Sequence, residues 1–370
     1  MAETFFLAAG GTGGHLFPAF ALAEELGRRG HTVDLVTDAR GDRYGSDFPA
    51  RTTHRIPAAT FRGVSLTSLR AVIRLSRGVV ASRTLIRKHR PAAVIGFGGY
   101  PTFPPLVAAG LTGTPSAIHE ANAVMGRANR ALASRVTMIA TSFADTAAID
   151  PKLAPRIRHT GNPVRDTVRA HAGRPYAPAT PEGPFNLLVF GGSQGARYFS
   201  DTVPDAVRLL PAPTRARLRV TQQCRDEDIA RVRATYADAG VDADLATFFT
   251  DLPERMATAH LVVARAGASS VSELEVLGRP SFLVPLPHAI DNDQLRNARA
   301  LAAAGGAWCL EQATLDAQTF AAELSGVMDA PYRLGAAAIA AAGQARPDAV
   351  DRLADLAEEL ASQRPAKAGR

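Results

Sequence analysis

The sequence has little cysteine and no long apolar run. Cys224 and Cys309 are its only cysteines, and they lie far apart without metal-ligand spacing, so neither a disulfide framework nor a zinc site is expected. No run approaches the roughly 18 apolar residues that a membrane-spanning helix needs. The apolar segment from Phe5 to Gly10 is too short for a signal peptide. These absences predict a cytoplasmic chain without a transmembrane segment.

Acidic residues are missing between Asp47 and Glu120, an interval that holds ten Lys and Arg. Residues 1–165 contain 21 Lys and Arg against 10 Asp and Glu, whereas residues 166–370 contain 21 against 25. The positive charge is therefore local. Such a field suits nucleic acid or an anionic lipid surface.

Apolar and basic residues alternate within this interval, which is typical of a helix lying at a membrane interface. Aromatic side chains for base stacking are missing there, which disfavours nucleic acid as the partner. A buried helix with a basic outer face would show the same pattern. The residues expected to face the membrane are Arg70, Val72, Ile73, Arg74, Arg77, Val80 and Arg83.

The 370 residues exceed the usual size of one core, which predicts two domains. Residues 4–9, a glycine turn, a helix over 16–29 and residues 32–37 form one βαβ pattern. Residues 176–184, rich in Pro and Gly, predict a linker between domains. Strand signals resume at 186–190 and alternate with helical ones, so both halves are expected to be open α/β domains with parallel sheets.

The turn Gly10-Gly-Thr-Gly-Gly-His15 joins a strand to a helix. Its glycines allow close approach of a ligand, and the free N–H groups at the start of the helix favour a phosphate. Leu16 stands where the dinucleotide-binding pattern needs a small residue, which argues against a dinucleotide cofactor. A tight turn without a ligand is the alternative. His15 is a candidate general base, or equally a capping or merely polar histidine.

A second turn, Gly191-Gly-Ser-Gln-Gly-Ala-Arg197, repeats this pattern at the start of the second half. Either turn alone is a weak signal. Two such turns at equivalent places in successive α/β domains favour a ligand bound in a cleft between the domains.

Further polar residues follow other predicted strands. In Arg265-Ala-Gly-Ala-Ser-Ser-Val-Ser-Glu273, Ser269 or Ser270 is expected to cap a helix, and Glu273 either completes a capping box or binds ribose hydroxyls. Gln294 and Asn297 share one helix face, by default a solvent-facing one.

Two more polar segments and two pairs of acids complete the candidates. His119-Glu-Ala-Asn122 follows an apolar strand, and Gly161-Asn-Pro-Val-Arg165 offers an arginine for phosphate. The pairs Asp242/Asp244 and Asp291/Asp293 are interpreted as turns or caps, because two carboxylates make a poor metal site. No metal site is predicted.

Six motifs, in order and spacing, closely resemble the MurG family of bacterial N-acetylglucosaminyltransferases. The resemblance spans roughly residues 4–345. The motifs are GGTGGHLFPAFALAEEL, FGGYPTFPP, HEANAVMGRANR, TGNPVR, GGSQGAR and RAGASSVSELEVLGRPSFLVPLPHAIDNDQ.

The resemblance implies a GT-B architecture, in which two Rossmann-like domains with parallel sheets face each other across a cleft. Residues 1–163 would form an acceptor- and membrane-facing domain and residues 164–345 a UDP-GlcNAc-binding domain. Residues 346–370 would form a helix returning to the first domain and a frayed tail.

The implied reaction is inverting transfer of GlcNAc from UDP-GlcNAc to the C4 hydroxyl of MurNAc in lipid I, giving lipid II without a metal or other cofactor. His15 matches a candidate base, and Glu120 is the reserve. The implied location is the cytoplasmic face of the cell membrane, with its anionic surface and cell-wall synthesis proteins as partners and no nucleic acid. The donor contacts carried over are Thr12, Gly13, Gly14, Asn122, Arg165, Ser193, Phe249, Ala268, Ser269, Ser270, Val271, Ser272, Glu273 and Gln294.

The sequence departs from the family pattern at Phe103, Ala121 and Asp293, none of which belongs to this donor set. The alternatives are a related GT-B enzyme, such as a glycolipid galactosyltransferase or a UDP-sugar epimerase, and a non-catalytic basic nucleotide-binding protein. The HEANAV and GNPVR segments argue against both enzymes, and a binding protein has no need of Glu273 or Gln294.

Overall fold

The chain forms two compact units in a computed structural model. The first comprises residues 1–165 with 348–370, and the second comprises residues 166–347. The structure describes residues 2–10, 13–38, 48–58, 66–191, 197–287 and 289–363, and only the backbone of residues 13, 66–70 and 290.

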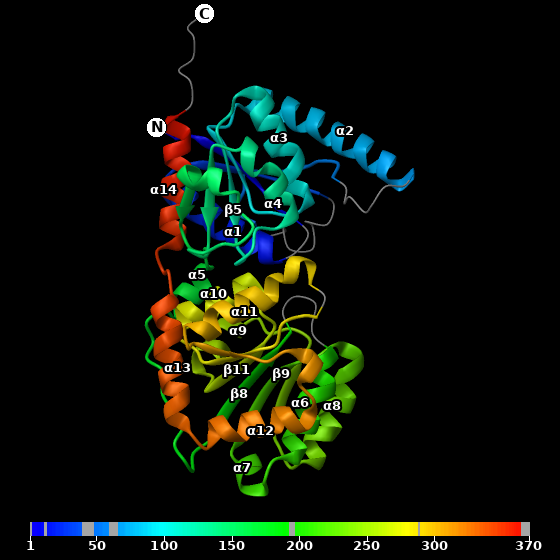
Figure 1. The fold of residues 1–370 in the computed structure, drawn as a ribbon, viewed down its shortest axis with the longest axis vertical. Helices are drawn as coiled ribbons and strands as arrows, with labels where there is room; N and C mark the ends of the chain where they lie inside the picture. The colour runs from blue at the N-terminus through cyan, green and yellow to red at the C-terminus, as the bar shows by residue number, and fades with distance from the viewer. Residues whose placement is uncertain are drawn as a thin grey trace, which may run out of the picture. The chain divides into compact units, whose positions relative to one another are not determined.

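The first unit, of whose strands Figure 1 labels β5, contains a seven-stranded parallel sheet in the order β3-β2-β1-β4-β5-β6-β7. The order reverses between β1 and β4, and open α/β sheets bind ligands at such switch points. The strands are β1 (Thr4–Ala8), β2 (Thr32–Thr37), β3 (Thr52–Arg55), β4 (Ala93–Gly96), β5 (Ser116–Glu120), β6 (Met138–Thr141) and β7 (Ile157–His159).

Different helices cover the two faces of this sheet. Phe5 and Leu7 of β1 pack with α1 and α14, while Phe6 and Ala8 pack with α2 and α3, because successive strand side chains point to opposite faces. The helices are α1 (Gly13–Arg28), α2 (Leu66–His89), α3 (Phe103–Thr112), α4 (Arg127–Leu132) and α14 (Ala349–Ser362), with 3-10 turns η2 (Tyr100–Thr102), η3 (Ala133–Arg135) and η4 (Pro151–Arg156).

Helix α14 belongs to the first unit, although 182 residues of the second unit separate it from β7 and its loop in sequence. The apolar residues Val350, Leu353, Leu356 and Leu360 are all buried, and α14 packs against α1. Arg29 donates from Nη1 to Asp355 at 2.6 Å and to Glu358 at 2.9 Å. Apolar burial and ion pairs therefore hold the last helix to the first.

The second unit contains a six-stranded parallel sheet in the order β10-β9-β8-β11-β12-β13, which reverses between β8 and β11. Its strands are β8 (Phe185–Phe190), β9 (Leu218–Gln223), β10 (Ala243–Ala246), β11 (Leu261–Ala264), β12 (Ser281–Leu283) and β13 (Ala307–Cys309).

Helices flank this second sheet, and the core includes Phe185 and Val189 of β8, Phe199 of α6 and Phe320 of α12. The helices are α5 (Asp166–Arg169), α6 (Arg197–Leu209), α7 (Ala212–Ala216), α8 (Asp226–Asp238), α9 (Leu252–Thr258), α10 (Ala268–Leu277), α11 (Asp293–Ala303), α12 (Ala317–Met328) and α13 (Pro331–Gln344), with 3-10 turns η5 (Ile290–Asn292) and η6 (Gln312–Thr314).

The α/β fold class predicted from the sequence, with two parallel sheets, is confirmed. The prediction of an interdomain linker at residues 176–184 is wrong, because this segment lies inside the second unit. The Tyr176 hydroxyl donates to the His260 carbonyl at 2.9 Å, and Arg217 donates to the Thr180 and Gly183 carbonyls. The prolines and glycines of residues 176–184 form irregular backbone, and hydrogen bonds hold this segment to the second unit.

None of the helices in the described part of the chain has both the length and the apolar character needed to cross a membrane.

Candidate functional site

His15 lies at the carboxyl edge of the first sheet, at its switch point. It is in the first turn of α1, directly after β1, and its ring packs against Gly98 and Gly99, which follow β4. A Cβ at Gly98 would approach the ring to 3.1 Å, and one at Gly99 to 3.3 Å. Both glycines have positive φ, +92° and +76°, which side chains rarely adopt. The two-glycine turn therefore leaves the space that His15 occupies.

The His15 ring is half-buried and lies within hydrogen-bond distance of a backbone carbonyl. Nδ1 is 3.3 Å from the Gly10 carbonyl oxygen. In the tautomer with its proton on Nδ1, the ring donates to this carbonyl, and Nε2 is left as a proton acceptor. This geometry suits a general base that accepts a proton at Nε2 while the hydrogen bond at Nδ1 orients the ring.

Glu120, the last residue of β5, is buried and accepts four hydrogen bonds from the loop that follows β5 and from helix α4. Oε1 accepts from the backbone and side-chain nitrogens of Asn122 at 3.0 and 3.2 Å, and Oε2 accepts from Gly126 N at 2.9 Å and Asn129 Nδ2 at 2.8 Å. Burial raises the pKa of this carboxyl, and the four N–H donors only partly offset the effect. The arrangement holds Asn122 in place.

Gly98 connects His15 with this loop. The same position that a Gly98 Cβ would occupy lies 3.6 Å from Asn129 Nδ2, the donor to Glu120. The structure therefore brings the candidate base, the reserve base and the Asn122 loop together at one edge of the first sheet.

His119 lies behind this cluster and is fully buried. Its Nε2 is 3.2 Å from the Gly161 carbonyl oxygen, in the turn that leads to Arg165. Burial lowers the pKa of His119 to about 4, with the nearby charge of His15 acting in the same direction. His119 is consequently neutral near pH 7.

Arg165 is the last residue of the first unit before the chain enters the second unit. Its guanidinium carbon lies 4.2 Å from the ring centroid of Phe17 on α1. Phe17 is two residues after His15, so the arginine reaches the same end of α1. Gly13 and Gly14 form the first residues of that helix. The predicted residues Gly13, Gly14, His15 and Arg165 therefore all lie near the start of α1.

In the second unit, the predicted donor residues other than Phe249 follow in sequence the carboxyl ends of three neighbouring strands. β11 pairs with both β8 and β12, and Ala264 lies opposite Phe190 and Leu283. In sequence, the second glycine turn follows β8, α10 follows β11, and the segment leading to α11 follows β12. This edge also includes the switch point between β8 and β11.

Helix α10 begins after Gly267, which is its N-cap and makes no side-chain capping bond. The expectation that Ser269 or Ser270 caps the helix is wrong, because both lie within its first turn. Glu273 lies six residues beyond the cap, too far for the predicted alternative of a capping box. Glu273 is buried, with only 5% of its surface exposed. The other predicted donor residues here are Ala268, Val271 and Ser272, all buried.

Helix α11 is fastened to this edge by two amides. Gln294 Oε1 accepts from Leu286 N at 2.9 Å, and Asn297 Nδ2 donates to the Ala266 carbonyl at 3.1 Å. Asn297 is fully buried, so the default of a solvent-facing pair is wrong for it. Asn297 instead joins α11 to the turn that precedes α10.

Arg265 is a residue of this edge that was not singled out from the sequence. Its Nη1 donates to the carbonyls of Val284 and Pro285 at 3.1 and 3.2 Å, and Nη2 donates to Gln312 Oε1 at 2.8 Å. It therefore joins the ends of β11 and β12. An arginine directly after a buried strand was the available signal.

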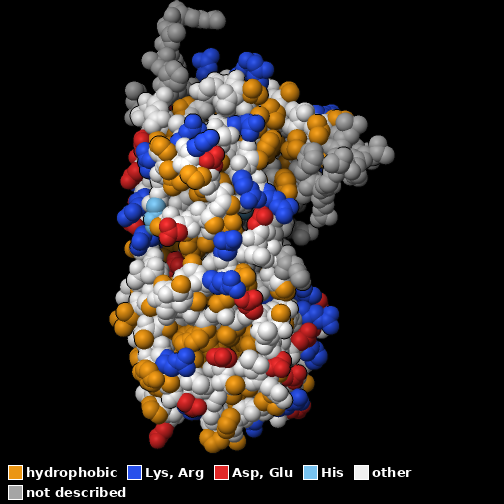
Figure 2. Space-filling view, viewed as in Figure 1, with side chains coloured by type: hydrophobic (Ala, Val, Ile, Leu, Met, Phe, Trp, Pro, Cys, Tyr) orange, Lys and Arg blue, Asp and Glu red, His pale blue; other side chains and the backbone are white. Residues whose placement is uncertain are grey.

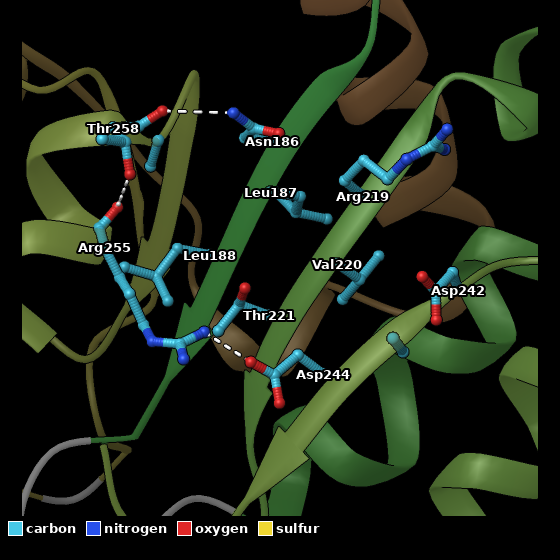
Figure 3. Close-up of a pocket in the computed structure, with 12 residues that line it drawn as sticks. Asn186, Leu187, Leu188, Arg219, Val220, Thr221, Asp242, Asp244, Arg255 and Thr258 are labelled. Atoms are coloured by element: carbon cyan, nitrogen blue, oxygen red, sulfur yellow. Dashed lines mark hydrogen bonds and ion pairs between the residues drawn. The ribbon is translucent and has the colours of Figure 1, made fainter. Parts of the chain in front are cut away.

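Phe249, another predicted donor contact, is buried beneath Arg255, whose guanidinium lies 4.4 Å from the ring centroid. Arg255 also lines a pocket of about 360 Å³ over β8, β9 and β10, where it pairs with Asp244 at 2.6 Å (Figure 3). None of the predicted site residues lines this pocket. We therefore place the candidate site at the strand ends, where the predicted residues gather.

Helix α2 presents apolar and basic side chains together to solvent. Val72, Ile73 and Val80 are 44%, 52% and 65% exposed. Ala71, Ser82 and Ile86 form the buried side, and Gly78 lies so close to the Pro57 carbonyl that a Cβ would come within 2.2 Å. Figure 2 shows hydrophobic side chains next to Lys and Arg over the first unit. The predicted membrane-facing residues that are exposed are Val72, Ile73, Arg74, Arg77, Val80 and Arg83.

Three predicted residues cannot be placed. Thr12 and Ser193 lie outside the described residues, as does the side chain of Arg70.

The chain matches both halves of one glycosyltransferase family. The family profile of the glycosyltransferase family 28 N-terminal domain matches residues 5–141, and that of its C-terminal domain matches residues 186–353.

Curated relatives match over nearly their whole length. A protein of Chelativorans sp. (strain BNC1) is 53% identical over 97% of this chain and 96% of its own, and one of Paramagnetospirillum magneticum is 51% identical over 95% of each. Both are named UDP-N-acetylglucosamine--N-acetylmuramyl-(pentapeptide) pyrophosphoryl-undecaprenol N-acetylglucosamine transferase.

Solved structures agree. Acinetobacter baumannii MurG superposes with a TM-score of 0.79 at 28% identity, covering 96% of this chain and 99% of its own. A UDP-GlcNAc 2-epimerase from Neisseria meningitidis has a TM-score of 0.66 at 12% identity, over 97% of this chain and 100% of its own, which shows the shared fold alone. With both glycosyltransferase family 28 domains and these relatives, the chain belongs to the MurG family of N-acetylglucosamine transferases.

Proposed function

We propose that this chain transfers GlcNAc from UDP-GlcNAc to the C4 hydroxyl of MurNAc in lipid I, with inversion at the sugar, to give lipid II. The observation that carries this proposal is 53% identity to a transferase of that name over 97% of the chain. The epimerase alternative is disfavoured, because its support is a fold shared at 12% identity.

The second unit is proposed to bind the donor at the edge formed by β8, β11 and β12. The buried Glu273 would accept hydrogen bonds from the ribose hydroxyls, and Gln294 and the first turn of α10 would contact the nucleotide. Free N–H groups at the start of a ten-residue helix favour a diphosphate. Arg265 and Asn297 would keep this edge rigid, since each joins two of its segments.

In the first unit, His15 is proposed as the base that takes the proton of the acceptor hydroxyl. Its support is the orientation of the ring by Gly10, Gly98 and Gly99. Glu120 remains the reserve, but both its oxygens already accept hydrogen bonds from its own loop. That arrangement favours a role in holding Asn122.

The departing UDP needs positive potential, and the proposal assigns this role to groups of the chain itself. Arg165 and the N-terminal ends of α1 and α10 are the groups proposed to supply it. An acceptor with a lipid tail also requires contact with a membrane. We propose that α2 makes this contact at the cytoplasmic face, through its apolar and basic exposed side chains, with cell-wall synthesis proteins as further partners.

The proposal is tested by incubating purified protein with labelled UDP-GlcNAc and a lipid I analogue in detergent. We expect a disaccharide-lipid product. We expect His15→Asn to lower kcat by about a hundredfold, the range of general-base contributions, while donor affinity changes little. A wild-type protein that neither forms product nor binds UDP-GlcNAc would refute the proposed function. Unchanged kcat in His15→Asn would remove only its role as base.

A further inference from the structure

Two histidines and a carboxylate meet in the first unit, away from the residues proposed for glycosyl transfer. Asp34 on β2, His54 on β3 and His89 at the end of α2 form what we call the Asp34 cluster. One ligand atom of each lies within 4.8 Å of the others. Asp34 is completely buried, and the two histidines are partly buried.

The sheet register explains why these residues meet. β2 and β3 are parallel, with Val36 opposite His54, and Asp34 is two residues before Val36. Asp34 and His54 therefore point to the same face, because side chains two apart share a face. That face carries Phe6 and Ile86, so α2 covers it and brings His89 down onto Asp34.

Phe6 supports both imidazole rings. Its centroid lies 5.7 Å from that of His54 and 6.0 Å from that of His89, while the histidine rings are 5.0 Å apart. Packing thus limits ring rotation, as is usual for ligands held in a fixed site.

The distances fit a tetrahedral metal ion. Asp34 Oδ2 lies 3.2 Å from His54 Nε2 and 3.8 Å from His89 Nδ1. Donors around a tetrahedral zinc ion are about 3.3 Å apart, given bonds of 2.0–2.1 Å. Burial tends to raise the pKa of Asp34, but hydrogen bonds from Arg51 and His54 outweigh it, and the carboxyl is ionised near pH 7.

Arg51 is the competing partner of Asp34. Its Nε donates to Oδ1 at 3.0 Å and its Nη2 to Oδ2 at 2.8 Å. The Arg51 side chain is 49% exposed, so it has room to turn into solvent. Its departure would free Asp34 Oδ2 and leave a fourth position open to water.

We propose that the Asp34 cluster is a site for a first-row transition-metal dication such as Zn²⁺, bound by Asp34, His54 and His89 in exchange for Arg51. Two imidazoles and a carboxylate are donors that this class of ion prefers. The bound ion joins the last residue of α2 to β2 and β3. This inference is independent of the proposed glycosyl transfer.

The test uses the full chain, stripped with a chelator and dialysed, without UDP-GlcNAc. Zn²⁺ is titrated by calorimetry, and Co²⁺ is titrated by visible absorption. We expect one equivalent of Zn²⁺ to bind and the thermal unfolding midpoint to rise with it. His54→Ala and His89→Ala should each weaken Zn²⁺ binding by more than about a hundredfold, since loss of even outer partners of a site costs about 10–100-fold.

Two further variants complete the design. His171→Ala removes a partly buried histidine of the second unit and should leave Zn²⁺ binding unchanged. Arg51→Gln removes the competing cation and should strengthen binding by about tenfold, as expected for one charge near the ion. Wild-type protein that binds no stoichiometric Zn²⁺, or histidine variants that bind it as well as wild type, would overturn the proposal. Should both histidine variants fail to fold, an Arg51→Gln protein that binds Zn²⁺ no better than wild type would overturn it.

Discussion

At the residue scale, the candidate site contains buried ionisable side chains that differ in their hydrogen bonds and in the direction of their pKa shifts. Glu120 keeps its carboxyl among four N–H donors, although burial raises its pKa. His119, its neighbour in sequence, is buried with a lowered pKa. Glu273, in the other unit, is buried near the first turns of α10. Burial thus favours the uncharged form of both Glu120 and His119.

Glu273→Ala should weaken UDP-GlcNAc binding by at least about tenfold, because a charged acceptor of ribose hydroxyls contributes about 1.5–3 kcal/mol. Isothermal titration measures the effect directly. Glu275→Gln is the matched control, since Glu275 lies on the same helix and is not among the predicted contacts. Donor affinity that survives in Glu273→Ala would rule out the ribose role.

His119 should make the protein less stable in acid. Its pKa is about 4 in the folded chain against an ordinary value of 6.5, so the unfolded chain binds the proton more tightly. The stability is therefore full above pH 6.5 and is lost as the pH falls towards 4, by about 3 kcal/mol. Denaturant unfolding of wild type and His119→Gln from pH 4 to 7 measures it. The two proteins should differ in pH dependence, and parallel curves would contradict the prediction.

At the element scale, the ends of strands and the outer side of α2 carry the proposed function. Glycines after β4 make room for His15, and Arg265 and Asn297 tie together the segments that follow β11 and β12. Gly78 allows α2 to lie against the Pro57 carbonyl, so its other side remains exposed. The alternative of a buried helix explains Ala71 and Ile86 but leaves the exposed Ile73 and Val80 unexplained.

Replacing Arg74 and Arg77 together by Glu should weaken binding to anionic vesicles by at least about thirtyfold. Each basic residue near an anionic leaflet contributes about 1 kcal/mol, and the reversal adds repulsion. Co-sedimentation with vesicles containing phosphatidylglycerol measures it. Arg208→Glu with Arg299→Glu makes the same change of charge in the second unit and should have little effect. Equal binding by both double variants and wild type would favour a purely structural α2.

At the scale of the whole molecule, the first unit is discontinuous in sequence. It includes residues 1–165 and regains α14 only after the second unit is complete. Leu353 and Leu360 of α14 are fully buried in the core that Phe5 and Leu7 of β1 share. The second unit, by contrast, is one uninterrupted stretch from Asp166 to Pro347.

We expect residues 166–347 alone to fold and residues 1–165 alone not to. Without α14, the first unit loses several buried leucines, and each such loss costs about 2–5 kcal/mol. Far-UV circular dichroism and cooperative urea unfolding of the two fragments measure this. A synthetic peptide of residues 348–363 should restore folding of the shorter fragment. Cooperative unfolding of residues 1–165 without the peptide would show that α14 is dispensable.

The sequence by itself determined the features that depend on local pattern. Alternating apolar segments and glycine turns predicted two α/β units with parallel sheets, and the six motifs identified the family. The short edge strands β3 and β7 were not predicted from the sequence. Their residues are polar or partly exposed and lack the apolar alternation of a core strand.

Only the tertiary structure decided which distant residues meet. The order of strands places Gly98 beside His15, and the register of β2 and β3 with the end of α2 assembles Asp34, His54 and His89. Each of these contacts joins segments separated by many residues. Strand pairing and helix packing create them, and the local sequence pattern has no information about either.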